Sequence, residues 1–293
     1  MNILSILDQL SSPNSTTAAP RRHVLHQLGA AGARLVAAGL PIVLATSPAQ
    51  ARPSATALDA VLLLLKLEEL QVAFYTQAAS AAALAAYQAD ITTIQAHQRG
   101  HLTFLRQFLT NAGVAVPATP TFDFSGQRGN TANPVLFADV FTSPANFLQL
   151  AQQLEDAAAG IYLSQAAVFT ERPTIMALYR MQSVEARHAA RIRSLRQTLL
   201  GTAGRAKSWP SRADTAPSAL IRVPAVPATT PASTTSIYSF ENNETQLVGG
   251  SRIVPYATLL ADASKLVQSN SLAEAFDELL PAAQATALLN IFG

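Results

Sequence analysis

The sequence predicts an all-α fold: an antiparallel four-helix bundle built from two helical hairpins joined by a long crossover. Three observations support this prediction. Residues 54–86 are rich in Ala and Leu and almost free of Gly and Pro. Helix-start and helix-stop signals divide residues 54–201 into two pairs of helices, each with a short internal turn. Between the pairs, residues 114–142 contain several prolines and glycines without clear periodicity. This connectivity is typical of bundles with one crossover.

The first expected hairpin covers residues 54–111. Its first helix spans 54–86 and contains the apolar run 61–65, flanked by charged residues that predict burial inside a protein rather than in a membrane. Asp90 is the expected N-cap of the second helix, because a short acidic side chain can accept bonds from free backbone amides. Gly113 is the expected C-terminal stop of that helix.

The second expected hairpin covers residues 143–201. Ser143 and Pro144 supply an N-cap and a proline for the first turn of the third helix, which is expected to reach about Phe169. Arg172-Pro173 opens the fourth helix, and Gly201 ends it. Residues 202–235 are rich in Pro, Thr, Ser and Ala and indicate a flexible linker. Residues 236–293, with a terminal helix over 281–291, are too few for a large core and are expected to dock on the bundle.

Residues 1–51 have the pattern of an export leader. Arg21-Arg22 precedes an apolar run over 35–45, and small residues over 47–51 suit a signal peptidase. The run is shorter than the ~20 residues that span a bilayer. The paired arginines resemble a twin-arginine signal. The sequence therefore predicts a periplasmic or otherwise exported protein without membrane insertion after cleavage. The alternative for this segment is an ordinary disordered tail.

Composition narrows the classes of function. The chain has no cysteine, which excludes disulfides, thiolate metal sites and thiol nucleophiles. The formal net charge is +2, and residues 1–51 account for all of it, so the remaining chain is neutral. A neutral domain gives no electrostatic reason to expect binding to nucleic acid or to an anionic membrane. Nucleophile elbows, phosphate-binding glycine loops and dinucleotide fingerprints are absent from the sequence.

An internal repeat with an offset of 87 residues contains the candidate functional residues. It relates the paired positions Glu68 and Glu155, Tyr75 and Tyr162, Gln98 and Glu185, and His101 and His188. Residues i and i+3 share one helix face, so Glu185 and His188 can reach a common point. Residues equally distant from the turn of an antiparallel hairpin lie at one level. Packing of the two hairpins about a pseudo-twofold axis should therefore bring the six carboxylate, amide and imidazole side chains together.

These motifs resemble those of the ferritin-like di-iron carboxylate superfamily, which has a Glu on each of two helices and Glu-x-x-His on each of the others. More narrowly, Leu67-Glu68-Glu69-Leu70 and Val184-Glu185-Ala186-Arg187-His188 are similar to the bacterial ferritin-like domain family that includes desiccation-related proteins. The segments around Tyr238 and Phe276 support this resemblance.

The resemblance implies a role for each of these residues. Glu68 and Glu155 would be terminal ligands of two metal ions, Glu185 would bridge them, and His101 and His188 would each bind one ion. Tyr75 and Tyr162 would orient the carboxylates by hydrogen bonding. Mixed oxygen and imidazole ligands suit iron or manganese, with zinc as a further occupant. For the two tyrosines, a plain role in the core is the alternative.

Gln98 departs from the family pattern, because it replaces the second bridging glutamate. A neutral amide leaves three carboxylates to balance two divalent ions, and buried charge needs a partner. Binding of the ion next to His101 is expected to be weakened more than binding of the ion next to His188. Glu69 points about 100° away from Glu68 and cannot substitute, and His97 is one residue off the face. The sequence leaves open whether the centre holds two ions, one or none.

Two functions follow from these observations, and the sequence does not decide whether the protein is an enzyme. One is an exported di-metal protein that handles iron, dioxygen or peroxide. The other is a non-catalytic structural or stress-protective protein, which Gln98 and the linker favour. An iron-storage cage ranks last, although a homo-oligomer is compatible with the sequence. Arginines 180, 187, 191, 193 and 196 are expected to form a solvated, ion-paired face, with an interaction patch as the alternative.

Overall fold

The computed structural model describes residues 54–201, 207–211, 214, 221–224, 234–242, 245–248, 252–255 and 278–293. All described residues belong to one unit, Arg52–Gly293. The predicted leader and most of the predicted linker lie outside the described residues.

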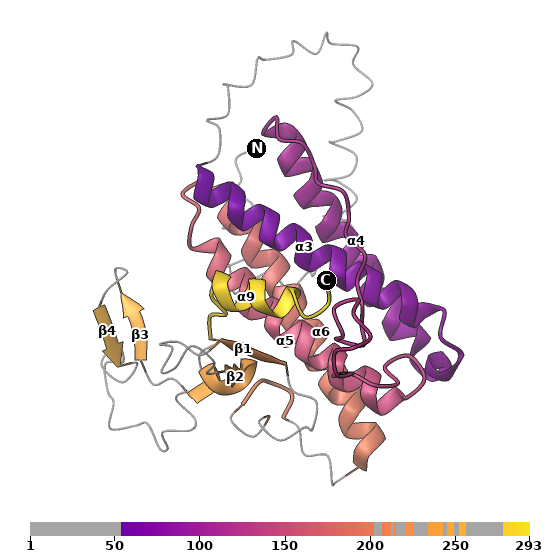
Figure 1. Ribbon diagram of the computed structural model, residues 1–293. Helices are drawn as coiled ribbons and strands as arrows, with labels where there is room; N and C mark the ends of the chain where they lie inside the picture. Colours follow the sequence, from indigo (N-terminus) through magenta and orange to yellow (C-terminus); the bar gives the residue numbers. More distant parts are fainter. Residues whose placement is uncertain are drawn as a thin grey trace, which may run out of the picture. The chain divides into compact units, whose positions relative to one another are not determined.

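Four long helices form the body of this unit (Figure 1). They are α3 (Ala55–Ala79), α4 (Gln88–Asn111), α5 (Pro144–Ala166) and α6 (Arg172–Leu200). Helix α3 packs along α4 and α5 packs along α6, while α3 also contacts α5. The prediction of an all-α bundle with two hairpins and one long crossover is therefore confirmed.

The helix ends follow local sequence signals, with two differences from expectation. Ser54 and Ser143 cap α3 and α5, each accepting a hydrogen bond from a backbone amide three residues later. Helix α3 ends at Ala79, and a 3₁₀-helix, η1 (Ala82–Tyr87), leads directly into α4. Helical geometry thus begins before Asp90, which lies in the first turn of α4 and is not its N-cap. Its carboxylate instead accepts from the guanidinium of Arg191 at 2.7 Å.

Helix α5 occupies the middle of the unit. It contacts α3, α6 and the later helix α9 (Ala282–Leu289), and almost every residue from Phe147 to Tyr162 is buried. Its aromatic partner on α3 is Phe74, whose ring stacks on that of Phe147 with centroids 5.2 Å apart. Polar side chains on α5 are therefore forced into the interior, where they need partners.

The residues after the bundle add small elements. Strand β1 (Arg222–Pro224) pairs antiparallel with β2 (Thr234–Ser236), and β3 (Thr245–Val248) pairs with β4 (Arg252–Pro255). The 3₁₀-helix η4 (Ile237–Asn242) follows β2, and α9 (Ala282–Leu289) lies close to the end of the chain. The strands were not predicted. Helix α9 contacts α3, α5 and β1, as expected for a segment that docks on the bundle.

The docking of the segment before α9 depends on Gly160 of α5. The Leu280 amide donates to the Gly160 carbonyl oxygen at 3.0 Å, and the Ser164 hydroxyl donates to the Leu280 carbonyl oxygen at 2.7 Å. A Cβ atom at position 160 would lie 2.8 Å from the backbone oxygen of Glu278. The absence of a side chain at this position allows the two backbones to touch.

Gly160→Ala is expected to lower the free energy of unfolding by about 1–3 kcal/mol, because the added methyl group overpacks a backbone contact. Gly100→Ala is the matched control: Gly100 is also within a helix, and its added Cβ meets nothing within 4 Å. The control should gain about 0.5–1 kcal/mol from helix propensity. Urea unfolding of both variants measures the difference, and equal midpoints would contradict the assigned contact.

No helix within the described ranges combines the length and the hydrophobicity needed to cross a membrane.

Candidate metal centre

The side chains related by the repeat meet in the interior of the bundle. Glu68 comes from α3, Gln98 and His101 from α4, Glu155 from α5, and Glu185 and His188 from α6. All six are buried, and the three glutamates and Gln98 have no exposed surface. The convergence expected from the repeat is therefore present in the structure.

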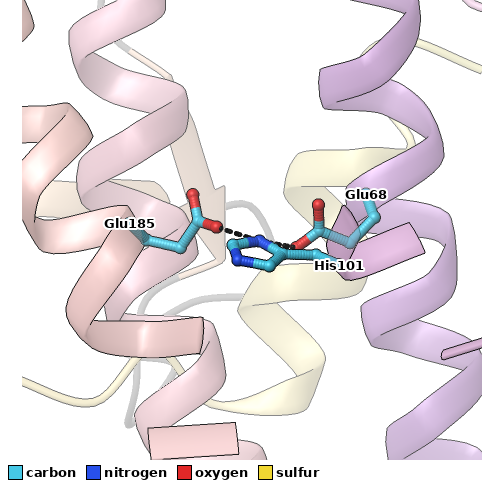
Figure 2. A group of neighbouring side chains, drawn as sticks. All are labelled: Glu68, His101 and Glu185. Atoms are coloured by element: carbon cyan, nitrogen blue, oxygen red, sulfur yellow. Dashed lines mark ion pairs between the residues drawn. The ribbon is translucent and has the colours of Figure 1, made fainter. Parts of the chain in front are cut away.

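Two overlapping triads have the spacing of metal ligands. Glu68, His101 and Glu185 form one, and Glu155, Glu185 and His188 form the other. Within each triad, one ligand atom per residue lies within 4.8 Å of the others. Figure 2 shows the first triad, with the His101 ring between a carboxylate on α3 and one on α6. His101 Nδ1 is 2.7 Å from Glu185 Oε1 and 3.4 Å from Glu68 Oε1.

The second triad has a similar layout. His188 Nδ1 is 3.2 Å from Glu155 Oε2 and 3.5 Å from Glu185 Oε2. Glu185 thus faces both histidines, with one carboxylate oxygen toward each. Glu185 therefore belongs to both triads.

The two tyrosines cross between the hairpins. Tyr75 of α3 donates its hydroxyl to Glu155 Oε1 of α5 at 2.5 Å, and Tyr162 of α5 donates to Glu68 Oε1 of α3. Each tyrosine therefore holds the glutamate of the opposite hairpin, as a pseudo-twofold arrangement requires. Such bonds fix the direction of carboxylate groups before any ligand binds.

Gln98 reaches across the centre from α4. Its amide nitrogen donates to Glu185 Oε2 at 2.9 Å and lies 3.3 Å from Glu155 Oε2. Ionised carboxylates only accept hydrogen bonds, so the NH₂ end must face them. The carbonyl oxygen of Gln98 is buried and has no hydrogen-bond partner in the protein.

Two further residues lie at the centre: Gln71, which the sequence did not predict, and His97, which was expected to lie off the face of the centre. Gln71 is fully buried one turn after Glu68, and its amide nitrogen lies 3.5 Å from Glu185 Oε2. In the sequence, only its position three residues after Glu68 indicated that it shares a helix face with that glutamate. The repeat gave no further signal, because the residue related to Gln71 by the repeat is the apolar Ala158. His97 Nδ1 lies 2.9 Å from His188 Nε2, with the two rings nearly parallel. Glu69 points away from the centre, as expected, and pairs with Arg106 at 2.8 Å.

Several buried polar atoms of the centre lack a hydrogen-bond partner. They are Glu68 Oε2, His101 Nδ1, Glu185 Oε1, Gln71 Oε1 and Gln98 Oε1. His101 Nδ1 and Glu185 Oε1 are close, yet they are not aligned for a hydrogen bond. Each buried polar atom without a partner costs about 1–3 kcal/mol. A divalent cation would satisfy such oxygen and imidazole donors, so the residues present fit a metal ion.

Burial and mutual contact shift the titration of the centre. Burial, reinforced by the nearby Glu185, raises the pKa of Glu68 to about 7 and that of Glu155 to about 8. Burial alone would lower the pKa of His101 and His188, but their glutamate neighbours raise both to about 10. Burial would raise the pKa of Glu185, but the two histidines lower it. Without metal, protonated histidines thus balance the carboxylates, and a metal ion must displace those protons.

The metal-free protein is expected to lose stability as pH rises from about 5 to 9. The two histidines, Glu68 and Glu155 all have folded-state pKa values above their unfolded values. Such groups stabilise the fold at low pH, and the contribution is lost as pH passes through the folded pKa. The lowered pKa of Glu185 affects only more acidic solutions. Urea midpoints with a chelator present measure the trend, and a midpoint that rises over this range would contradict it.

A second buried cluster corrects the prediction for the arginines of α6. Arginines 180, 187 and 191 are exposed, but Arg193 is fully buried and Arg196 is half-buried. Arg193 donates to Asp156 on α5, with the closer contact at 2.6 Å, and to both oxygens of Asp214 at 3.0 Å. Tyr238 of η4 also donates to Asp156, at 2.7 Å. The expectation of a solvated face was wrong for Arg193, because the segment after the bundle covers it.

Comparison with known proteins agrees with this geometry. Residues 56–198, which include nearly all of the four long helices, match the family described as the ferritin-like domain. No curated protein matches the chain. The part of the chain that holds the two triads is therefore similar to ferritin-like domains.

Proposed function

We propose, taking residues 56–198 as a ferritin-like domain, that this protein binds redox-active metal in its bundle and acts on iron, dioxygen or peroxide. One observation carries the proposal: two overlapping carboxylate–histidine triads lie in the core, and three of their buried ligand atoms have no hydrogen-bond partner. Burying such a cluster costs free energy unless its charged groups are paired, and a bound cation would provide that pairing.

Each residue of the centre has a task in this proposal. Glu68 and Glu155 would be end ligands, Glu185 would contribute to both positions, and His101 and His188 would each hold one ion. Bound iron or manganese would supply Lewis acidity and electrons. Tyr75 and Tyr162 hold the end carboxylates in place, and the apolar core around them keeps bulk water out. Iron and manganese both suit this donor set.

The compartment is part of the same proposal. The leader pattern over residues 1–51, with its paired arginines, supports export of the folded and loaded protein to the periplasm. N-terminal sequencing of the protein recovered from a periplasmic fraction tests this point. A mature chain that begins near residue 52 is expected, and a full-length chain confined to the cytoplasm would contradict it.

The activity is tested by following consumption of peroxide or dioxygen with ferrous iron as the electron donor. Wild-type protein is expected to accelerate the reaction over iron in buffer, and Glu185→Gln is expected to lose that acceleration. Glu171→Gln is the matched control, since Glu171 is exposed at the start of α6 and its side chain caps no helix amide. Equal rates for wild type and Glu185→Gln would exclude the proposed chemistry at this centre.

A second candidate is a structural or desiccation-protective protein on the same scaffold. The amide of Gln98 favours it, because its hydrogen bonds tie Glu155 to Glu185 without any metal. In that case the melting temperature should not respond to ferrous or manganous ions, whereas true binding raises it by mass action. A metal-dependent rise would remove this candidate.

A further inference from the structure

The two triads differ in which of their ligand atoms take part in hydrogen bonds. Glu68 Oε2, His101 Nδ1 and Glu185 Oε1 are buried without hydrogen-bond partners, and all three atoms belong to the first triad. The carboxylates of this triad are fully buried and come from α3 and α6, on either side of the His101 ring (Figure 2). Three donors from three helices therefore converge, and they contact one another only through the ion pairs of His101 Nδ1, at 2.7 Å to Glu185 Oε1 and at 3.4 Å to Glu68 Oε1.

In the second triad the corresponding atoms are engaged. Glu155 Oε1 accepts from Tyr75, and Glu155 Oε2 accepts from Gln98 at 3.3 Å and lies 3.2 Å from His188 Nδ1. Glu185 Oε2 accepts from Gln98 at 2.9 Å and from Gln71 at 3.5 Å. The NH₂ group of Gln98 thus lies against both carboxylates of this triad and serves as their hydrogen-bond donor.

We propose that the centre binds a single divalent ion between Glu68, His101 and Glu185, and that the Gln98 amide closes the second position. This inference rests on the proposed function, because it specifies the occupancy of the same centre. Gln98 is then a specificity-determining residue that converts a two-ion framework into a one-ion site.

Charge balance supports the assignment. Three carboxylates offset most of the charge of two divalent ions but leave one buried positive charge without a partner, which a dry interior tolerates poorly. The asymmetry also reverses the expectation from sequence that the position next to His101 is the weaker one. Gln98 shares α4 with His101, but its side chain reaches across to Glu155 on α5 and Glu185 on α6. The hydrogen-bonded half is therefore the half that contains His188.

Titration of the metal-free protein with Mn²⁺, followed by electron paramagnetic resonance, tests the occupancy. One ion per chain with the six-line signal of an isolated ion is expected. Two ions of similar affinity with a spin-coupled signal would overturn the inference and leave the proposed function intact. No bound Mn²⁺ at all would overturn both.

Two repeat-related variants test the location of the ion. Glu68→Gln should weaken Mn²⁺ binding beyond the roughly 10–100-fold that loss of an outer-shell partner costs, while Glu155→Gln should retain one ion. Both positions are fully buried and bonded to a tyrosine of the opposite hairpin, so the two changes are matched. The reverse pattern, with the ion lost only in Glu155→Gln, would overturn the assignment.

Gln98→Glu tests the role of the amide. The added carboxylate removes the amide donor and balances a second ion, so this variant should take up two Mn²⁺ ions with a coupled signal. Gln107→Glu makes the same change at an exposed position of α4 and should bind one ion like wild type. If Gln98→Glu still binds one uncoupled ion, the amide is not what closes the second position.

Discussion

Arg193→Met is expected to lower the free energy of unfolding by about 3–5 kcal/mol, the usual cost of removing one member of a buried ion pair. The Arg193 side chain has no exposed surface, and its partners Asp156 and Asp214 are also buried. Burial already raises the pKa of Asp156 even with the arginine in place. Without the guanidinium, two buried carboxylates would face each other with no cation between them.

The repeat supplies a matched control for this change. Arg106 lies 87 residues before Arg193, and it pairs with Glu69, which lies 87 residues before Asp156. The Arg106 side chain is 41% exposed, and Thr119 would remain as a donor to the buried Glu69 at 2.8 Å. Arg106→Met should therefore cost less than Arg193→Met, about 1–2 kcal/mol. Chemical unfolding of both variants measures the two costs. Similar losses would show that the segment after the bundle does not seal Arg193 as the structure indicates.

Glu185→Gln is expected to abolish stabilisation by divalent metal. This residue faces both histidines and belongs to both triads, so no other single change removes as much of the donor set. At free metal 100 times the dissociation constant, binding stabilises wild type by about 2.7 kcal/mol. For a domain of this size that corresponds to a rise in melting temperature of roughly 5–10 °C.

Thermal unfolding of Glu185→Gln with and without Mn²⁺ measures this effect. Little or no metal-dependent rise is expected, while the exposed control Glu171→Gln should respond like wild type. A full metal-dependent rise in Glu185→Gln would place the binding site outside the bundle interior.

The bundle and the six side chains of its centre could be predicted because the repeat encodes both at once. Equal spacing from two turns is enough to place Glu68 beside Gln98 and His101, and Glu155 beside Glu185 and His188. The presence of Gln71 at the centre could not be predicted from the repeat, because the related residue, Ala158, carries no polar group. The strands could not be predicted, because segments of three or four residues contain too little periodicity to recognise.

The error at Arg193 has a different origin. Arginine is almost always exposed unless it is paired, and the pairing depends on Asp214 and Tyr238, which follow the bundle in sequence. Helix periodicity says nothing about where such a segment docks. The same offset of 87 residues relates Glu69 to Asp156 and Arg106 to Arg193, so the ion pairs themselves were open to prediction. The difference in burial between the Arg106 and Arg193 side chains could not be predicted in this way.

The metal content of the wild-type chain tests the central claim most directly. Protein purified under metal-replete conditions and analysed for elements should carry about one iron or manganese ion per chain, with release at acid pH as protons displace the ion. A content below about 0.3 ions per chain, unchanged by added metal, would contradict a metal centre in this bundle, because even weak binding saturates under excess ligand.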